Sequence, residues 1–423
     1  MSGPTIDPAT SAVSKRVAIY SHDTFGLGNI RRMVAVAEHL IGQDPELHVL
    51  VITGSPMTQA FRISSRIDFV KLPCLSRDAL GGYGTRSLPL NNRQLFAMRS
   101  DLIRATLENY RPDLILVDKK PLGVEGELEA ALDRLATAPR PPALILLLRD
   151  ILDAPETTRA VWARHGYHEV ISQHYDLVLV AGQPEVFDLA AAYGFPDSTR
   201  RRLRYCGYIR RADLPAVPMP PEPGRVLVTA GGGGDGFPLL HAFLAGLRQT
   251  RPAGLRRSLV ITGPEMDNRQ RNHLASLARG LQTATLLEFC PDMAQETARA
   301  QVVVCMGGYN TLCEMLAMGK RVICAPRVQP VREQWLRARL LADRGLLSCI
   351  EPARLGPRHL MQALGAALSQ RSCPRTTARL DFNGLDRIGY WTLRLLSERR
   401  PRVTAPPIHI ELPQRACHAS VGA

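Results

Sequence analysis

The chain has 423 residues, 45% of them hydrophobic and 5% aromatic, a length that two domains organise more readily than one core. Its apolar runs fall far short of the roughly 20 residues of a membrane-spanning helix, and residues 1–14 lack the pattern of a secretion signal. The nine cysteines contain no Cys-x-x-Cys pair, so neither a disulfide framework nor a structural zinc site is expected. We therefore expect a cytoplasmic protein with reduced thiols.

The net charge of +14 comes from 53 basic residues, almost all of them arginine. Arginine grips phosphate and anionic lipid through two parallel hydrogen bonds, although a GC-rich genome produces the same bias. No helix-turn-helix or RNP signature is visible, so no nucleic-acid partner is expected. An anionic membrane surface remains a candidate partner, which would place the protein at the inner face of the plasma membrane. A dense basic run near the middle of the chain comprises Arg200, Arg201, Arg202, Arg204, Arg210 and Arg211.

The first half alternates short apolar runs with amphipathic stretches. The runs predict buried strands at residues 17–20, 48–52, 68–72, 114–117, 143–148 and 177–180. Helical patterns cover residues 30–41 and 93–109. Alternation of this kind requires a parallel sheet covered on both faces.

The alternation restarts after residues 214–224, which carry five prolines and predict an interdomain linker. Strands are predicted at residues 225–229, 258–262, 284–288, 302–305 and 322–324. Helices are predicted at residues 237–247, 273–281, 312–318, 332–343, 359–368 and 390–397. Residues 401–423 show no periodicity and are expected to be a disordered tail.

The predicted architecture is α/β, with two doubly wound, Rossmann-like domains that face one another. The expected boundaries are a flexible N-terminus (1–14), an acceptor-side domain (15–213), the linker (214–224), a nucleotide-sugar-binding domain (225–375) and a helical segment (376–400). Open α/β sheets bind ligands at their carboxyl edges, so the site is expected in the crevice between the domains.

Three glycine-containing turns follow predicted strands. The first, Ser-His-Asp-Thr-Phe-Gly-Leu-Gly-Asn, ends at Gly28 and Asn29 and serves either as a tight turn or as a backbone contact for an anion or sugar. The second spans residues 229–236 and holds four consecutive glycines, which favour a nest of N–H groups for phosphate around Gly233 and Gly234. No Lys-Ser/Thr follows it, so this turn is not a P-loop for ATP.

The third turn, Met-Gly-Gly-Tyr-Asn-Thr-Leu-Cys-Glu, spans residues 306–314. Gly307 and Gly308 allow close backbone approach, and Thr311 can give a hydroxyl to phosphate at the helix start. Glu314 lies one turn further on, where it either caps the helix or accepts two hydrogen bonds from a ribose. Downstream, Glu333 and Gln334 form an acid-plus-amide pair suited to reading sugar hydroxyls.

The C-terminal motifs resemble the donor half of GT-B glycosyltransferases of family 28, typified by the lipid II-forming N-acetylglucosaminyltransferase. They are Leu-Glu-Phe-Cys-Pro-Asp-Met-Ala, Val-Val-Cys-Met-Gly-Gly-Tyr-Asn-Thr-Leu-Cys-Glu and Val-Arg-Glu-Gln-Trp-Leu-Arg-Ala, within residues 287–338. The N-terminal motifs Tyr-Ser-His-Asp-Thr-Phe-Gly-Leu-Gly, Pro-Asp-Leu-Ile-Leu-Val-Asp-Lys-Lys-Pro-Leu-Gly and Leu-Arg-Asp-Ile-Leu-Asp resemble a related group of bacterial predicted glycosyltransferases. The resemblance spans most of residues 15–370.

The resemblance implies a role for each donor-side position. Gly233, Gly234 and Thr311 would lie by the diphosphate. Phe289 and Met293 would border the base, Glu314 would hold the ribose, and Glu333 with Gln334 would hold the donor sugar. The family's first turn commonly ends in His near the acceptor, whereas this chain has Asn29, which cannot take up a proton.

An inverting transfer needs a base for the acceptor proton. The candidates follow strands of the N-terminal sheet: His22 first, Asp150 second, then Asp23 and Asp118. His22 could equally be a structural hydrogen-bonding group, and Asp23 or Asp150 a helix cap. The chain has no Asp-x-Asp motif and no carboxylate pattern around its histidines, so no metal or other cofactor is expected.

The function expected from these residues is transfer of a hexosyl or N-acetylhexosaminyl group from a UDP-sugar to an acceptor hydroxyl, by inversion and without a metal. The acceptor is unidentified, and a lipid-linked molecule or a polysaccharide precursor of the cell envelope is a candidate. One alternative is a UDP-sugar 2-epimerase of the same fold. The other is a non-catalytic nucleotide-sugar-binding protein, for which Asn29 is the main support.

Overall fold

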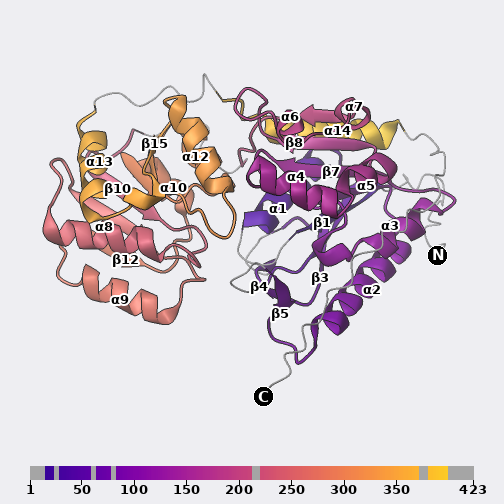
Figure 1. The fold of residues 1–423 in the computed structure, drawn as a ribbon, viewed down its shortest axis with the longest axis horizontal. Helices are drawn as coiled ribbons and strands as arrows, with labels where there is room; N and C mark the ends of the chain where they lie inside the picture. Colours follow the sequence, from indigo (N-terminus) through magenta and orange to yellow (C-terminus); the bar gives the residue numbers. More distant parts are fainter. Residues whose placement is uncertain are drawn as a thin grey trace, which may run out of the picture.

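The computed structural model describes residues 15–22, 28–58, 63–77, 82–211, 220–370 and 380–398. Two lobes lie side by side, the C-terminal lobe at the left of Figure 1 and the N-terminal lobe at the right. Each is built on a parallel sheet with helices packed against it. The predicted α/β class and doubly wound order are therefore confirmed.

The N-terminal sheet has seven parallel strands in the order β3-β2-β1-β6-β7-β8-β9. Its interior strand β1 alternates between two apolar clusters, with Val17 and Ile19 on one face and Ala18 and Tyr20 on the other. The strands are β1 (Lys15–Ser21), β2 (Leu47–Thr53), β3 (Ile67–Lys71), β6 (Leu114–Asp118), β7 (Ala143–Arg149), β8 (Leu177–Ala181) and β9 (Leu203–Tyr205). All six strands predicted in this half fall on observed strands.

Helices and one hairpin complete the N-terminal lobe. The predicted helices at 30–41 and 93–109 lie within α1 (Gly28–Gln43) and α2 (Asn92–Tyr110), and Asn91 caps α2 through its side chain. A hairpin of β4 (Leu75–Arg77) and β5 (Tyr83–Thr85) precedes α2. The remaining helices are α3 (Glu129–Ala136), α4 (Pro155–Arg164), α5 (Tyr167–His174), α6 (Leu189–Ala192) and α7 (Asp197–Arg200), with a short 3-10 turn, η2 (Val124–Gly126).

The C-terminal sheet has six parallel strands in the order β12-β11-β10-β13-β14-β15. They are β10 (Arg225–Thr229), β11 (Arg257–Ile261), β12 (Ala284–Leu287), β13 (Val302–Cys305), β14 (Arg321–Cys324) and β15 (Ser348–Cys349). The helices are α8 (Phe237–Gln249), α9 (Asn268–Ala278), α10 (Met293–Arg299), α11 (Tyr309–Ala317), α12 (Glu333–Asp343) and α13 (Pro357–Ser369), with a 3-10 turn, η3 (Pro352–Arg354). All five strands predicted in this half are observed.

The last described helix, α14 (Gly384–Ser397), returns to the N-terminal lobe. It packs on α1 and contacts β7, and Figure 1 shows it in the N-terminal lobe although it follows the C-terminal lobe in sequence. One apolar cluster runs through both lobes and includes Tyr208, Ile209 and Tyr309. The Ile209 N–H donates to the Tyr309 hydroxyl at 3.2 Å, so the lobes share a packed junction.

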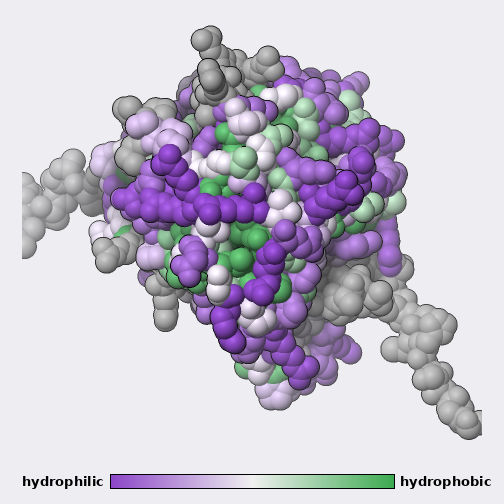
Figure 2. All heavy atoms as spheres, turned by 90° about the vertical axis from the view of Figure 1, so that its left-hand side faces the viewer, coloured by the Kyte–Doolittle hydropathy of each residue, from purple (hydrophilic) through white to green (hydrophobic). Residues whose placement is uncertain are grey.

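Several predicted segments lie outside the described residues, namely 1–14, most of the linker and the tail 401–423. Residues 220–224 of the linker form an irregular segment that ends in a turn, as their prolines require. The outer face of the C-terminal lobe is mostly hydrophilic, with smaller apolar areas between (Figure 2). Across the described ranges, no helix combines the length and apolarity needed to cross a membrane.

Candidate functional site

The segment between β13 and α11 forms a backbone-lined turn. Gly307 has φ 93°, and a Cβ there would come within 2.8 Å of the Cys324 Sγ, so only glycine fits. Gly308 occupies the N-cap position of α11, and no side chain caps the helix. Thr311, half-buried, lies in the first turn. This helix start presents N–H groups and the positive end of the helix dipole, which suits an anion.

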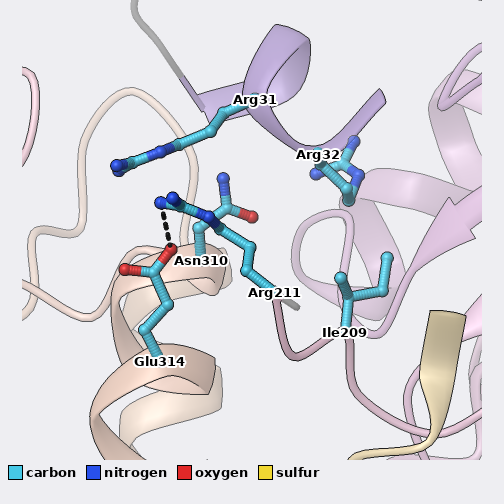
Figure 3. A pocket seen from close by; sticks show the side chains of 6 residues that line it. All are labelled: Arg31, Arg32, Ile209, Arg211, Asn310 and Glu314. Atoms are coloured by element: carbon cyan, nitrogen blue, oxygen red, sulfur yellow. Dashed lines mark hydrogen bonds and ion pairs between the residues drawn. The ribbon is translucent and has the colours of Figure 1, made fainter. Parts of the chain in front are cut away.

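Glu314 points into a pocket at the junction of the lobes (Figure 3). Its Oε1 lies 3.4 Å from Nη1 of Arg211. Arg211 belongs to the end of the N-terminal lobe, just before the linker. Arg31 on α1 extends toward the same carboxylate from the N-terminal lobe. The pocket, which Arg32, Ile209 and Asn310 complete, has a volume of ≈ 10 Å³, about one water molecule. The Arg211 side chain therefore covers the carboxylate that the sequence assigns to a ribose.

The four-glycine turn after β10 is explained partly by packing. Gly233 has φ 100°, and a Cβ there would meet the Thr262 carbonyl oxygen at 2.3 Å. A Cβ at Gly236 would overlap Ala230 at 2.1 Å. Gly234, by contrast, is exposed, and a Cβ there would come no closer than 3.8 Å to another side chain, the Glu265 carboxylate. Backbone packing thus requires two of these glycines, and Gly234 remains accessible to a ligand.

Arg327 connects this turn to the start of α12. Its guanidinium lies 2.5 Å from an Asp235 carboxylate oxygen and 3.0 Å from Oε1 of Glu333. In the amide orientation that satisfies both groups, Gln334 donates to the Met306 carbonyl at 2.7 Å and accepts from Arg327 Nε at 3.2 Å. Oε2 of Glu333 is buried and has no hydrogen-bond partner in the described part of the chain. One carboxylate oxygen is therefore left for a ligand.

Phe289 and Met293 flank the carboxyl end of β12. Phe289 is 58% exposed, which is unusual for a large aromatic side chain. Met293 is the first residue of α10, and its partly buried side chain packs against the apolar cluster that runs through both lobes. An exposed aromatic face beside a sheet edge is suited to stacking with a nucleotide base.

His22 follows β1 and is buried, with 1% exposure. Neither ring nitrogen has a hydrogen-bond partner among the described residues. Burial, followed by repulsion from Lys119 and Lys120, holds the pKa of His22 well below its usual range, so the ring is neutral at pH 7. A neutral, unpartnered imidazole can accept a proton once a hydroxyl reaches it.

Asp150 has a different environment. Its two carboxylate oxygens accept hydrogen bonds of 2.8 Å from Nε and Nη2 of Arg337 on α12, and Oδ1 also accepts from the Ile151 N–H at 2.7 Å. Asp150 thus joins the two lobes, and in this arrangement its oxygens are occupied. Its role as the second candidate base stays a prediction.

The first turn is described only in part. Asp23 lies outside the described residues. Asn29 donates to the His22 carbonyl oxygen, and Gly28 accepts a 2.6 Å hydrogen bond from Asn310 Nδ2 on α11. Asn29 therefore holds the backbone of His22, and Gly28 meets the donor-side helix. Asp118, the remaining carboxylate, pairs with Arg32 at 2.6 Å.

The sequence did not single out several basic groups of this site. It gave no role to Arg31, Lys119, Arg149, Arg327 or Arg337, although Lys119, Arg149 and Arg337 lie within the motifs that carry the resemblance. Three arginines of the basic run, Arg200, Arg202 and Arg204, donate to backbone carbonyls, as Arg202 does to Tyr175 at 2.6 Å. Arg211 is the member of the run that lines the pocket. No group of three or more His, Cys, Asp or Glu side chains in the described ranges is arranged to hold a metal.

Residues 226–382 match the family model of the glycosyltransferase family 28 C-terminal domain. The C-terminal lobe is therefore similar to the family 28 C-terminal domain, and the chain has the GT-B fold of its solved neighbours. Its solved structural neighbours include Acinetobacter baumannii MurG (TM-score 0.58, 15% identity, 90% of this chain and 99% of that one). They also include the calicheamicin glycosyltransferase CalG4 (0.59, 14%, 92% and 100%). A Medicago truncatula protein complexed with UDP-glucose is similar as well (0.61, 10%, 92% and 100%).

Two curated relatives share the name UDP-N-acetylglucosamine–N-acetylmuramyl-(pentapeptide) pyrophosphoryl-undecaprenol N-acetylglucosamine transferase. The protein from Haemophilus influenzae strain PittEE is 38% identical over 84 residues, 20% of this chain and 24% of its own length. The one from Histophilus somni strain 129Pt is 25% identical over 268 residues, 62% of this chain and 66% of its own length. The matched stretch thus spans about a quarter of the first relative, and likeness is greatest over a short segment.

Proposed function

We propose that this family 28-like protein transfers a hexosyl or N-acetylhexosaminyl group from a UDP-sugar to an acceptor hydroxyl. The observation that carries the proposal is that Glu314 and the uncapped start of α11 lie at the junction with the lobe that bears His22. A nucleotide and an acceptor could thus meet there. The relatives named above, which act on UDP-N-acetylglucosamine by their printed name, support the choice of donor.

In this proposal the donor binds to the C-terminal lobe. Its diphosphate lies at the start of α11, near Gly307, Gly308 and Thr311, with the accessible Gly234 beside it. Glu314 takes the ribose hydroxyls, which requires Arg211 to leave the carboxylate it now covers. Phe289 stacks on the base, and the unpartnered Glu333 oxygen, with Gln334, takes the donor sugar.

The proposed reaction is a direct displacement with inversion. The acceptor oxygen forms a bond to the anomeric carbon as the bond from that carbon to the diphosphate oxygen breaks, and the electron pair leaves with UDP. His22 accepts the acceptor proton, because its ring is neutral and both nitrogens lack a partner. Negative charge that develops on the leaving diphosphate is stabilised by the helix dipole and by Arg31 and Arg211, without a metal ion.

The proposal extends to the acceptor and to the cellular location. The net charge of +14 and the names of the curated relatives support an acceptor linked to a lipid of the cell envelope, reached from the cytoplasmic face of the membrane. Electrostatic binding of this kind weakens with salt. Vesicles with anionic lipid should therefore bind the protein at low salt, and absence of binding there would remove the membrane part of the proposal.

The donor part is tested by thermal shift with UDP-GlcNAc, UDP-glucose, UDP-galactose and GDP-mannose. At least one UDP-sugar is expected to raise the melting temperature of the wild-type protein, and Glu314→Gln is expected to abolish that rise. Glu351→Gln, which changes an exposed carboxylate on the segment before η3, is the matched control. A rise with GDP-mannose alone would make the donor assignment wrong.

A product assay separates transfer from the alternatives. Transfer consumes a UDP-sugar only when an acceptor is present and releases UDP. Release of an epimerised UDP-sugar without an acceptor would instead identify an epimerase. Binding without turnover under all acceptors tried would favour a nucleotide-sugar sensor, for which the position of Asn29 against the His22 backbone is the relevant observation.

A further inference from the structure

Three segments of the C-terminal lobe come together at the carboxyl edge of its sheet. They follow β10, β13 and β14, which are neighbours in the sheet, with Thr229 paired to Cys305 and Cys305 paired to Cys324. Because adjacent strands lie about 4.8 Å apart, the residues that follow them share a short stretch of sheet edge. The three segments are residues 230–236, 306–308 and 325–332.

Short distances show that these segments touch one another. A Cβ at Gly236 in the first segment would lie 3.5 Å from the Met306 sulfur in the second. A Cβ at Gly307 would lie 3.6 Å from the Cβ of Pro326 in the third. A side chain that starts in the third segment can therefore reach the four-glycine turn in the first.

The guanidinium of Arg327 makes this connection. Its Nε lies 2.5 Å from Oδ2 of Asp235, the residue after the accessible Gly234. Its Nη2 lies 3.0 Å from Oε1 of Glu333, and its Nη1 donates to the Val331 carbonyl at 3.0 Å. The guanidinium thus lies between the turn proposed for the diphosphate and a residue proposed for the donor sugar, and its contacts before α12 hold it there without Asp235.

The two carboxylates that pair with Arg327 differ in exposure. The Glu333 side chain is 6% exposed, whereas the Asp235 side chain is 49% exposed. An ion pair with a half-exposed partner contributes little to stability, because water solvates the separated charges almost as well. Asp235 can therefore leave the guanidinium easily, while Glu333 keeps it in position.

The four-glycine turn needs a cation if it is to hold a diphosphate. The Glu265 carboxylate lies close to it, since its Oε2 would be 2.9 Å from a Cβ at Gly232 and 3.8 Å from one at Gly234. A diphosphate at the turn would therefore meet Glu265 and Asp235 in addition to the backbone N–H groups, and like charges at short range repel. Arg327 brings a positive charge to this position.

We propose that Arg327 binds the sugar-bearing phosphate of the donor, and that the Asp235 carboxylate occupies the place of this phosphate in the free protein. The inference rests on the proposed function, because it adds a residue to that donor site. The sugar-bearing phosphate is favoured over the nucleoside-bearing one, since Arg327 also pairs with Glu333, which the proposed function assigns to the sugar. A phosphate offers more acceptor oxygens and more charge than a carboxylate, so it can displace Asp235 from the guanidinium.

The exchange also has a consequence for the proposed reaction. When the bond from the anomeric carbon to the phosphate oxygen breaks, the electron pair stays on that oxygen, which belongs to the terminal phosphate of the UDP product. Arg327 stabilises this charge from within the donor-binding lobe. Arg31 and Arg211, in contrast, belong to the other lobe.

Calorimetric titration of the full chain with UMP, UDP and inorganic pyrophosphate tests the assignment. Arg327→Gln is expected to weaken UDP binding about tenfold, because a charge-assisted contact is lost. It should leave UMP binding unchanged, because UMP lacks the second phosphate. Arg327→Lys keeps the charge and should lose less affinity for UDP than Arg327→Gln. Asp235→Asn removes the competing carboxylate at nearly constant shape, so UDP should bind about threefold more tightly.

The opposite signs at the two partners separate a ligand contact from a purely structural ion pair. If the pair only held the two segments together, loss of either partner would change UDP affinity in the same direction. Arg279→Gln and Asp343→Asn are the matched controls, because they change an exposed cation and an exposed carboxylate just before β12 and β15, at the opposite edge of the sheet. Both should bind UDP as the wild-type protein does.

Three results would overturn the assignment of Arg327. They are equal UDP affinity in wild type and Arg327→Gln, a loss of UMP affinity as large as the loss of UDP affinity, and UDP binding by Asp235→Asn that is no tighter than that of wild type. Retained UMP binding also shows that a variant is folded.

Pyrophosphate separates this inference from the proposed function. If wild type binds pyrophosphate but neither UMP nor UDP, the donor proposal fails. Weaker pyrophosphate binding by Arg327→Gln then supports the phosphate contact, and equal binding overturns it. Wild type that binds none of the three ligands would contradict both proposals.

Discussion

Arg337 on α12 binds Asp150 at the end of β7 through two hydrogen bonds of 2.8 Å, and the side chains of both residues are buried. The same guanidinium donates to the Gly307 carbonyl at 3.1 Å, in the turn that leads into α11. One side chain of the C-terminal lobe therefore fixes the donor-side turn and the N-terminal sheet edge relative to one another. This side chain should therefore contribute to stability, and it holds the proposed donor and acceptor sites next to each other.

Arg337→Met is expected to destabilise the protein by about 3–5 kcal/mol, because it leaves the Asp150 carboxylate buried without its partner. The double variant Asp150→Leu with Arg337→Met should recover much of that loss, since it removes both charges. Urea denaturation of the three proteins measures the difference. Arg104→Gln, which breaks a half-exposed pair with Glu108 on α2, is the control and should cost about 0.5 kcal/mol or less. A single variant as stable as wild type would contradict the interlobe role.

The strands could be predicted because β-branched and leucine-rich runs such as 114–117 are buried on both faces of a parallel sheet. The short strands β9 and β15 could not, since two or three residues of mixed polarity have no period. Helix α10, with the sequence Met-Ala-Gln-Glu-Thr-Ala-Arg, is too polar to show an apolar stripe. The predicted start of α9 at residue 273 was five residues late, because Asp267 caps a polar first turn.

Site residues could be predicted from the sequence where their position depends only on the end of a nearby strand. Glu314 and Glu333 follow strands of one lobe, so their place at the sheet edge could be anticipated from local sequence. The partners of Asp150 and Glu314 could not, because Arg337 and Arg211 come from distant parts of the chain and resemble dozens of other arginines.

Removal of the Arg211 guanidinium is expected to separate nucleoside from diphosphate recognition. Arg211→Gln uncovers Glu314, so uridine should bind as well as or better than it binds to wild type. UDP should bind about tenfold more weakly, because a phosphate contact is lost. Competition against a fluorescent UDP analogue measures both affinities, and Arg354→Gln on η3 is the control. If uridine and UDP lose affinity to the same extent, Arg211 does not move from Glu314 to a phosphate when the nucleotide binds.

Substitution by alanine should lower stability at one glycine of the turn after β10 and leave it unchanged at another. Gly236→Ala forces a Cβ against Ala230 at 2.1 Å and is expected to lower the free energy of unfolding by about 1–3 kcal/mol. Gly234→Ala meets its nearest atom at 3.8 Å and should leave stability nearly unchanged. Thermal unfolding gives both values. If Gly234→Ala weakens UDP binding while its melting temperature is normal, the turn contributes to the donor site.

The pKa of His22 predicts how stability depends on acid. Because the folded protein keeps this ring neutral, the unfolded chain binds an extra proton once the pH falls below about 6.5. The free energy of unfolding of the wild-type protein should therefore decrease as the pH falls through this range. His22→Leu lacks this effect, so the difference in unfolding free energy between wild type and variant should move in favour of the variant between pH 7.5 and pH 5. A difference that is independent of pH would mean that His22 has the same pKa in the folded and the unfolded protein.

The lysine at position 119 predicts a different pH window. Its folded pKa of about 7 lies below the ordinary 10.5, so between these values the unfolded chain binds more protons than the folded one, and stability rises with pH. Below pH 7 the full penalty of a charged, desolvated ammonium remains. Lys119→Gly removes this penalty together with the strain of a left-handed φ, so it should stabilise the protein most below pH 7 and progressively less toward pH 10. Denaturation at pH 6.5 and pH 9.5 tests this, and a variant less stable than wild type at both values would show that the buried lysine contributes more to stability than its burial and backbone strain cost.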